Sequence, residues 1–396
     1  MIEKIPKIRK ILFYIALTIE LLLVIVDKSE LTNPYISYFF RLTFLLTLAV
    51  VLLSEYTKAE WLVLIGMCAV GMLSYYLSGR NEVLRFTIFI AACRQMDLKH
   101  TMRYSFLVTL AGCTAIALLS ITGIFGAVSL TQDYGRGSGV ITRYTLGFGH
   151  PNSLQCMFFM VMILGMYVYH NRMRWYIYVC LLAANAWIYY LTDSRTGFIV
   201  ATGAILLSAL MQLPVCRQRR FPYYSAIALL GGCVGFSIWA AANSKDCWQP
   251  QKLVDKIDHF LNGRIVQLYW GTKAHAGAIQ TWHLFSDHHS EEFFDMGWVR
   301  LFYWYGWIPA IIAIALLVLL LVECGRKHDG AVLVMVISMT VYTVVEAHLV
   351  SAYIGRNYLL LVLGAYWPMM LHIDRGNSVG IIHWIKKYEI RESNKE

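Results

Sequence analysis

The chain has 396 residues, of which 58% are hydrophobic and only 15% are charged, and its formal net charge is +10. Soluble proteins usually carry about 25% charged residues, so the composition excludes an ordinary soluble protein and indicates an all-α polytopic membrane protein. The positive charge does not indicate a nucleic-acid partner, because the basic residues lie in short segments between apolar runs, where they orient membrane helices.

Apolar runs recur along the chain, and we expect one membrane domain, residues 1–396, with about twelve transmembrane helices. No cleavage site with small residues follows the first run, so we interpret it as a retained helix rather than a signal peptide. The run at 82–93 is short for a bilayer crossing, but the distribution of basic residues requires a crossing there. The expected spans are 11–26, 35–53, 61–77, 82–93, 105–128, 153–169, 175–191, 197–213, 223–242, 298–322, 331–350 and 357–372.

The basic residues also predict which side of the membrane each loop faces. Lysines and arginines concentrate at the N-terminus, after the eighth span and in a tail at residues 373–396, and such residues are enriched on the cytoplasmic side. We therefore expect a protein of the cytoplasmic (inner) membrane with both termini in the cytoplasm. One large loop, residues 243–297 between the ninth and tenth spans, then faces the side that lacks ATP and nucleotide sugars.

The cysteines and the glycines predict no cofactor. The phosphate-binding pattern G-x-x-x-x-G-K-[ST] is absent, and the nine cysteines are scattered without a C-x-x-C pair. We therefore expect neither a nucleotide, nor a disulfide framework, nor a zinc knuckle. The histidines and carboxylates at the end of the large loop leave a divalent-cation site open as an alternative.

One candidate anion site lies at the expected outer end of the sixth span. Arg143 precedes a glycine-containing turn that ends in His150, Pro151 and Asn152. Proline suits the first turn of a helix, and His150 would lie near the cap. The free N–H groups of such a helix end can hold an anion. The alternative is a simple cap and turn without a ligand.

A second candidate lies at the outer end of the eighth span. Asp193 or Ser194 can cap an inward-running helix there, and Arg195 follows at its first turn. A cation is disfavoured at this positive end of the helix dipole, and a bound phosphate would resolve that conflict. The alternative is an interfacial arginine that snorkels and pairs with Asp193.

The large loop supplies a third arginine, Arg264, which follows Asn262 and Gly263. Together with Arg143 and Arg195 it could clamp a diphosphate, because guanidinium groups match phosphate oxygens bidentately. Such a clamp could stabilise a departing diphosphate without a metal.

The end of the large loop offers general bases, namely His288, His289 and Asp295. A histidine or carboxylate within hydrogen-bond reach can take the proton of an attacking hydroxyl. The alternatives are the cation site above and a solvated acidic stretch. Asp295 is also placed to cap a helix that begins near Trp298.

Four ionisable residues fall inside expected spans, near their outer ends. Such charges are costly and usually face a cavity or snorkel to the interface. Glu346 and His348 could line a substrate cavity or pair with each other. The four residues are Arg41, Arg85, Glu346 and His348.

With these features, the chain resembles the Wzy-type polysaccharide polymerases, within the larger group that includes the O-antigen ligases. The resemblance covers roughly positions 143–310 and rests on four motifs in order: Gly147-Phe148-x-His150-Pro151-Asn152, Ser194-Arg195-Thr196-Gly197, Gly263-Arg264 followed by Trp270, and Asp295-x-Gly297-x-x-Arg300-Leu301 running to Tyr305-Gly306.

The resemblance implies a GT-C-like glycosyltransferase that joins undecaprenyl-diphosphate-linked repeat units, with a chain-length regulator and a flippase as possible partners besides donor, acceptor and bilayer. Arg195 and Arg264 match the family's phosphate-binding arginines, whereas Arg143 is a looser match. The remaining expected substrate-binding residues are His150, Asn152, Arg41 and Arg300.

The ligase pattern of a histidine before a Gly-x-x-Gly pair is absent, which favours a polymerase. An O-antigen ligase and a flippase or transporter of such lipids are the alternatives.

Overall fold

The computed structural model describes residues 4–133, 139–249, 252–287, 292–371 and 378–380. It is mainly helical, with 74% helix and sixteen α-helices in these ranges. The helices are α1 (Ile5–Lys28), α2 (Ile36–Leu52), α3 (Lys58–Ser78), α4 (Glu82–Cys93), α5 (Leu98–Ile121), α6 (Pro151–Val168), α7 (Trp175–Thr192), α8 (Arg195–Leu210), α9 (Pro214–Arg217), α10 (Phe221–Asn243), α11 (Leu253–Phe260), α12 (Arg264–Trp270), α13 (Gly297–Tyr305), α14 (Trp307–Lys327), α15 (Gly330–Val345) and α16 (Leu359–Met370).

Strands are few and short, and they form two antiparallel pairs, β1 with β4 and β2 with β3. Short 3-10 turns complete the described elements. The strands are β1 (Glu55–Thr57), β2 (Ser129–Asp133), β3 (Val140–Tyr144) and β4 (Ser378–Gly380), and the 3-10 turns are η2 (His170–Arg172), η3 (Ser244–Trp248), η4 (Ile279–Thr281) and η5 (Ile354–Arg356).

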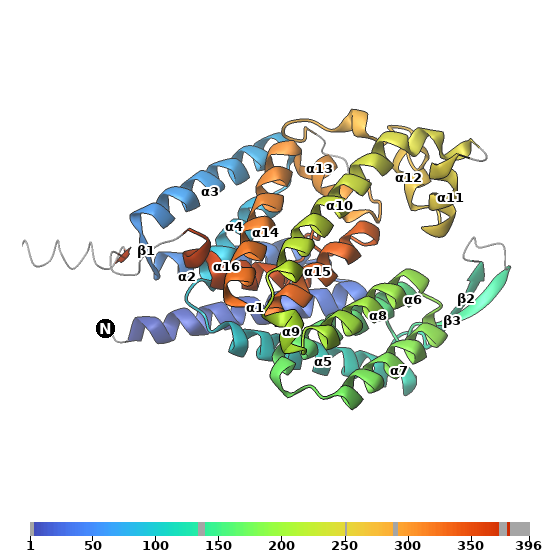
Figure 1. The fold of residues 1–396 in the computed structure, drawn as a ribbon, viewed down its shortest axis with the longest axis horizontal. Helices are drawn as coiled ribbons and strands as arrows, with labels where there is room; N and C mark the ends of the chain where they lie inside the picture. Colours follow the sequence, from blue (N-terminus) through green and yellow to red (C-terminus); the bar gives the residue numbers. More distant parts are fainter. Residues whose placement is uncertain (1–3, 134–138, 250–251, 288–291, 372–377, 381–396) are drawn as a thin grey trace, which may run out of the picture.

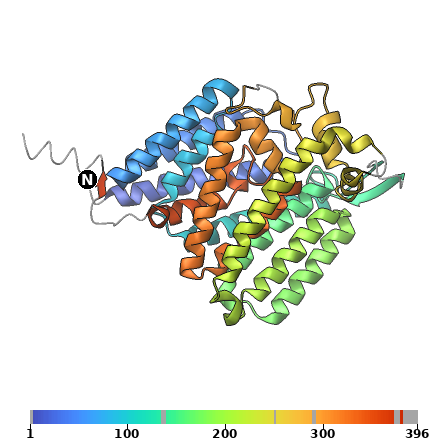
Figure 2. The same ribbon diagram turned by 45° about the horizontal axis from the view of Figure 1, so that its top comes forward.

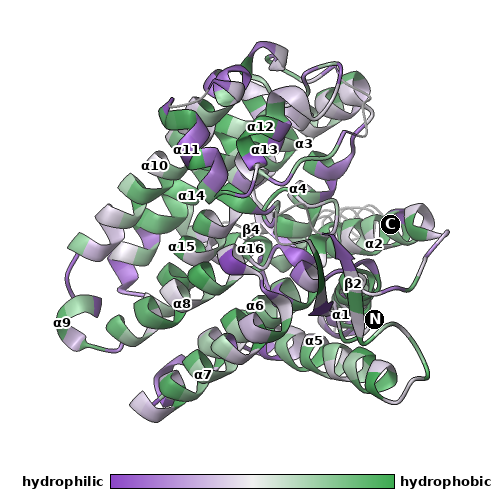
Figure 3. Ribbon diagram, turned by 90° about the vertical axis from the view of Figure 1, so that its right-hand side faces the viewer, coloured by the Kyte–Doolittle hydropathy of each residue, from purple (hydrophilic) through white to green (hydrophobic). Residues whose placement is uncertain are grey.

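Five helices of the described ranges are long and apolar enough to cross a membrane: α3, α5, α6, α14, and α10 together with η3. Four shorter apolar helices, α2, α8, α15 and α16, accompany them. The prediction of a helical protein able to span a membrane is therefore confirmed. Each expected span contains a helix, but twelve crossings remain a prediction. In Figure 3 the long helices are mainly hydrophobic along their length.

The expected span 298–322 is wrong as a single helix, because the chain breaks at Gly306 between α13 and α14. Gly306 has a φ of +92°, and a Cβ there would lie 2.6 Å from the carbonyl oxygen of Leu284. Only glycine adopts such a conformation without strain and permits this approach. The end of the large loop packs into the break, where Trp307 N–H donates to the His283 carbonyl at 2.9 Å.

The expected span 105–128 also ends earlier than predicted, because α5 stops at Ile121. The following segment turns into β2, which pairs with β3 and places Leu130 opposite Arg143. Arg143 therefore belongs to a β-hairpin, and not to an irregular loop. In Figure 1 this hairpin projects at the right of the molecule, while the N-terminus lies at the left.

The large loop 243–297 is folded over much of its described length into η3, α11, α12 and η4. Figure 1 shows α11 and α12 on the same side of the molecule as the β2–β3 hairpin. α10 leads into this region and packs beside α14, as Figure 2 shows from another angle. The loop and the hairpin thus share one end of the helical body.

α15 lies at the centre of the helical body, in contact with α6, α8, α10 and α13. Most of its residues are buried, because they are apolar on all sides. Its C-terminal end opens onto the segment 346–358, which returns to α16 through η5. The candidate site is built around this end of α15.

Candidate active site

Four charged side chains meet at the end of α15, and we call them the ionic cluster: Arg264, Asp295, Glu346 and Arg356. Arg264 Nη2 lies 3.1 Å from Glu346 Oε1, and Arg356 Nη2 lies 3.8 Å from Glu346 Oε2. Arg264 Nε lies 3.6 Å from Asp295 Oδ2. The two arginine side chains are each 7% exposed, Glu346 is 19% exposed and Asp295 is 37% exposed, so the cluster is open to solvent mainly at Asp295.

The local sequence explains why Arg264 points into this cluster. Asn262 and Gly263 both adopt positive φ, +55° and +77°, which reverses the chain directly before α12. The Asp258 carboxylate then accepts the N–H groups of Ile265 and Val266 at 2.6 and 3.1 Å, and so caps the N-terminus of α12. The Asn-Gly-Arg sequence therefore fixes the position of Arg264 at the first turn of the helix.

The segment after α15 positions the two partners of Arg264 in a similar way. Glu346 lies directly after α15, and its N–H donates to the Tyr342 carbonyl at 2.8 Å. Arg356 ends η5, and the next residue, Asn357, donates from its side chain to the Leu349 carbonyl at 3.2 Å. This bond closes the segment on itself, so that Glu346 and Arg356 face each other.

Cys156 in the second turn of α6 connects the ionic cluster to a buried histidine. Its Sγ lies 3.6 Å from Arg356 Nη2 and 3.8 Å from His348 Nε2. The His348 ring packs on Tyr342, with ring centroids 4.2 Å apart. The suggested pairing of Glu346 with His348 is thus not what the structure has: their side chains contact Arg264 and Cys156 instead.

Arg143 is buried and holds two helix ends together. Its Nε donates to the Thr192 carbonyl at the end of α7, and its Nη2 lies 3.3 Å from Asn152 Oδ1 in the first turn of α6. His150 occupies the N-cap of α6, where its Nδ1 accepts from Asn152 N–H at 3.1 Å, as the position before Pro151 predicts. Arg143 therefore contributes to the frame around the ionic cluster.

Arg195 occupies the first turn of α8 and is 63% exposed, with its Nε 3.9 Å from Asp193 Oδ1. Ser194 holds the N-cap position, but its side chain makes no cap hydrogen bond. Two residues later, a Cβ on Gly197 would lie 3.3 Å from Tyr342 Oη. The start of α8 therefore packs against α15 through Gly197, one turn before Glu346, and Arg195 lies two residues earlier on the same helix.

Of the three expected bases, only Asp295 lies in the described residues, since His288 and His289 fall outside them. The expectation that Asp295 caps the next helix is wrong. That helix, α13, begins at Gly297 with Met296 at the cap position and no side-chain cap bond. Asp295 instead faces Arg264, as the most exposed member of the cluster.

Arg300 interacts electrostatically with Arg356, Asp295 and Glu346 of the ionic cluster, but its direct contacts are with its own segment. Its Nε donates to the Phe294 carbonyl at 3.1 Å, and its Nη2 binds the same oxygen. The guanidinium carbon lies 3.8 Å from the ring centroid of Phe293 and 4.6 Å from that of Trp304. These contacts hold the chain at the entry to α13, because cation–π stacking and carbonyl acceptance engage the whole guanidinium.

The two arginines of the first spans, by contrast, make their contacts away from the cluster. Arg41 is exposed on α2, 5.8 Å from the ring centroid of Tyr38. Arg85 is buried, with its Nη2 3.1 Å from Glu20 Oε1. A charge inside an apolar helix bundle needs such a partner. None of the contacts described for Arg41 or Arg85 joins them to Arg264 or Arg356.

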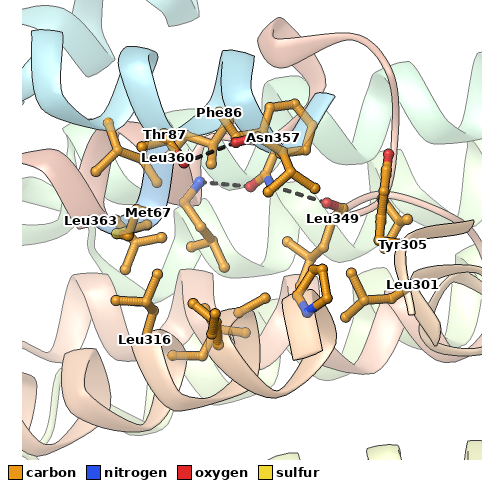
Figure 4. Close-up of a pocket in the computed structure, with 18 of the residues that line it drawn as sticks. Met67, Phe86, Thr87, Leu301, Tyr305, Leu316, Leu349, Asn357, Leu360 and Leu363 are labelled. Atoms are coloured by element: carbon orange, nitrogen blue, oxygen red, sulfur yellow. Dashed lines mark hydrogen bonds between the residues drawn. The ribbon is translucent and has the colours of Figure 1, made fainter. Parts of the chain in front are cut away.

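An apolar cavity of about 120 Å³ begins beside the ionic cluster and runs between α3, α4, α13, α14 and α16. Asn357 lines it, directly after Arg356 in the chain. In Figure 4 Asn357 lies at one side of the cavity with Leu349 and Leu360 near it, and Leu316 lies across from them. A polar and charged region therefore borders an apolar one at Arg356 and Asn357.

The sequence did not predict that Arg356 and Glu346 belong to the ionic cluster. No motif in the sequence marks Arg356, and Glu346 was predicted only to line a substrate cavity or to pair with His348. Glu346 nevertheless carried a signal: a carboxylate at the end of a strongly apolar run needs a cation nearby. Among the described residues, no group of three or more His, Cys, Asp or Glu side chains could hold a metal ion.

Comparison with protein-family models, with curated proteins and with solved structures found no match for this chain.

Proposed function

We propose that this protein polymerises undecaprenyl-diphosphate-linked oligosaccharide repeat units on the outer face of the cytoplasmic membrane, within a GT-C-like bundle of about twelve crossings. The observation that carries the proposal is the junction at Arg356 and Asn357, where the ionic cluster borders the apolar cavity. A lipid-linked diphosphate needs both environments, because it joins a strongly anionic group to a long hydrocarbon chain.

The arginines provide the groups that this substrate requires. Arg195 is exposed at the start of α8, and the buried Nε atoms of Arg264 and Arg356 have no hydrogen-bond partner among the described residues. Guanidinium groups bind phosphate oxygens bidentately and retain their charge at every physiological pH. In the proposed complex these three arginines bind the diphosphate, and the apolar cavity receives the adjoining isoprene units.

Asp295 supplies a link between substrate binding and the reaction. It is the most exposed cluster member, and at 3.6 Å it is the looser of the two carboxylates facing Arg264. A diphosphate oxygen replaces Asp295 at Arg264 Nε, while Glu346 continues to hold the two guanidinium groups. The released carboxylate then accepts a proton from the acceptor hydroxyl, a role for which His288 and His289 are the other candidates.

The glycosyl transfer then proceeds without a further reagent. The acceptor hydroxyl oxygen forms a bond to the anomeric carbon of the donor chain as the bond from that carbon to the diphosphate oxygen breaks. Undecaprenyl diphosphate leaves with the electron pair, and the arginines stabilise its developing charge. The hydroxyl proton passes to the base, so that atoms and charges balance.

A synthetic undecaprenyl-diphosphate-linked repeat unit given to the purified protein tests the proposal. A polymerase converts it into a ladder of longer lipid-linked products that gel electrophoresis resolves. A ligase yields product only when a different acceptor is added. A flippase or transporter moves the lipid across a vesicle membrane and makes no longer product. Either of these last two results would overturn the polymerase assignment.

A further inference from the structure

A polar hollow of about 600 Å³ lies at the end of the helical body away from the ionic cluster. It opens where α5 and α15 begin and where α6 and α14 end, with α9 at its side. Five cationic side chains line it, and we call it the basic hollow. They come from four separate segments: Lys99 and Arg103, Arg172, Arg217, and Lys327.

The charge of the basic hollow is not neutralised by the protein. Asp329 is the single carboxylate in its wall, which gives a formal charge of +4 with the histidines neutral. Both Asp329 oxygens already have partners: Oδ1 accepts Val332 N–H at 3.1 Å, and Oδ2 accepts the Tyr366 hydroxyl at 2.6 Å. In the part of the chain that the structure describes, none of the salt bridges involves Arg103, Arg172 or Arg217.

The wall of the basic hollow is packed rather than loose. His170 is buried, and the Gln212 side chain donates to the His170 carbonyl at 2.8 Å and to the Tyr178 hydroxyl at 3.0 Å. A Cβ on Gly330 would lie 3.6 Å from Arg217 Cγ, so the base of the arginine rests against the start of α15. Burial lowers the pKa of His170, and Arg217 acts in the same direction against the opposing effect of Asp329.

Orientation in the membrane accounts for basic residues at this end, but not for their convergence on one hollow. Arg174 and Arg219 belong to the same two connecting segments as Arg172 and Arg217, and they lie outside the lining. The orientation of the protein in the membrane would be favoured equally by the lining pair, Arg172 and Arg217, and by the pair outside the lining, Arg174 and Arg219. Cations held around a common space at this density favour a multivalent anion.

We propose that the basic hollow binds a phosphate-bearing anion, either a free phosphate compound or the headgroup of an anionic lipid. The arginine forks at Arg103, Arg172 and Arg217 suit phosphate oxygens, which accept paired charge-assisted hydrogen bonds. The hollow is large enough for more than one phosphate group, since ligand sites commonly measure about 300–1,000 Å³. Binding of this anion to the basic hollow does not depend on the reaction proposed at Arg264, because Arg264 lies at the other end of the helical body.

Two matched double variants test this proposal. Arg172→Gln with Arg217→Gln removes two cations from the lining, and Arg174→Gln with Arg219→Gln removes two from the same segments outside it. Inorganic pyrophosphate is titrated calorimetrically into the full-length protein in detergent. Retention of phosphatidylglycerol against phosphatidylcholine is counted by native mass spectrometry. Melting temperatures confirm that each variant is folded, and Lys99→Gln with Arg103→Gln replaces the first pair if that pair unfolds.

Loss of two arginine contacts should weaken binding about tenfold or more in the lining variant and leave the matched variant unchanged. A loss confined to pyrophosphate identifies a free phosphate compound as the ligand, and a loss confined to phosphatidylglycerol identifies a lipid headgroup. Arg264→Lys should retain this binding component, which separates the hollow from the proposed diphosphate site. Equal losses in the two double variants, or no binding of either probe to the unaltered protein, would overturn the proposal.

Discussion

Arg264 Nη2 lies 3.1 Å from Glu346 Oε1, and this contact ties the large loop to the end of α15 across 82 positions of sequence. It holds a guanidinium group that is 7% exposed at the point where the loop, α15 and η5 meet. A buried charge without its partner is strongly unfavourable, so the two residues depend on each other.

A double-mutant cycle measures this dependence. Arg264→Gln or Glu346→Gln alone should destabilise the protein by up to about 3 kcal/mol, because each leaves a largely buried charge with only its more distant partner, Arg356 for Glu346 and Asp295 for Arg264. The double variant should lose less than the sum of the two, with a coupling on the order of 1–3 kcal/mol. Thermal unfolding in detergent, followed by circular dichroism, provides the measurement.

The pair Lys252 and Asp246 is a suitable control for that cycle. Lys252 Nζ lies 2.7 Å from Asp246 Oδ2, and the two side chains are 46% and 37% exposed. Their cycle should show a coupling well under about 1 kcal/mol, as is usual for exposed pairs. Strictly additive losses at Arg264 and Glu346 would mean that the ionic cluster is not a unit.

Arg143 and Arg195 should respond differently to replacement by alanine. Arg143 is buried and bonded to the Thr192 carbonyl and to Asn152, so its loss should lower both the melting temperature and the polymer yield. Arg195 is largely exposed, so its loss should leave the melting temperature unchanged. The ladder assay should nevertheless show at least a tenfold loss for Arg195→Ala, as expected for one stabilising group of a transition state.

Arg195→Lys refines that comparison. Lysine retains the charge but lacks the fork, so it should restore little of the activity if the arginine binds phosphate oxygens in pairs. Full activity of both Arg195 variants would remove this residue from the proposed site.

Gly306→Ala should destabilise the protein by roughly 1–3 kcal/mol or more, because φ is +92° and a Cβ would lie 2.6 Å from the Leu284 carbonyl oxygen. Gly203→Ala in α8 is the matched control: a Cβ there meets nothing within 4 Å, and alanine is the better helix former. The difference between the two melting temperatures is the readout. A Gly306→Ala protein as stable as the control would contradict the packing of the loop end into the helix break.

Removal of metal ions should leave the proposed reaction intact, since arginines stabilise the leaving diphosphate in this mechanism. Protein treated with EDTA and assayed in metal-free buffer should give the same ladder as untreated protein. Activity that returns only with added divalent cations would instead support a metal site at the acidic and histidine-containing end of the loop.

Local patterns predicted much of the frame of this site. The His150–Pro151 cap, the helix start at Arg195 and the helical nature of the apolar runs follow from residue type and spacing within a few positions. Features that depend on contacts between distant parts of the chain could not be predicted from residue type and spacing. The break at Gly306 was hidden because one glycine barely changes the hydropathy of an apolar run, and the space it leaves is filled by a segment twenty residues earlier.

The spacing of residues along the sequence also could not predict which charged side chains contact each other. In the sequence Arg356 resembles any arginine of a short connecting segment, and only the structure shows its contacts with Glu346 and Cys156. Asp295 has the residue type and position of a helix cap, but its proximity to Arg264 depends on how the large loop folds over α15. Such contacts arise from tertiary structure, and sequence periodicity carries no information on them.

The most direct test of the central claim is the ladder assay on the purified protein and on Arg264→Lys, with a synthetic undecaprenyl-diphosphate-linked repeat unit as the sole substrate. Melting temperatures of the two proteins accompany it. Our account predicts a ladder from the unaltered protein and a loss of about a hundredfold or more from the folded Arg264→Lys protein, because lysine cannot engage Glu346 and a phosphate together. A ladder of normal length from the variant, or none from the unaltered protein, would contradict it.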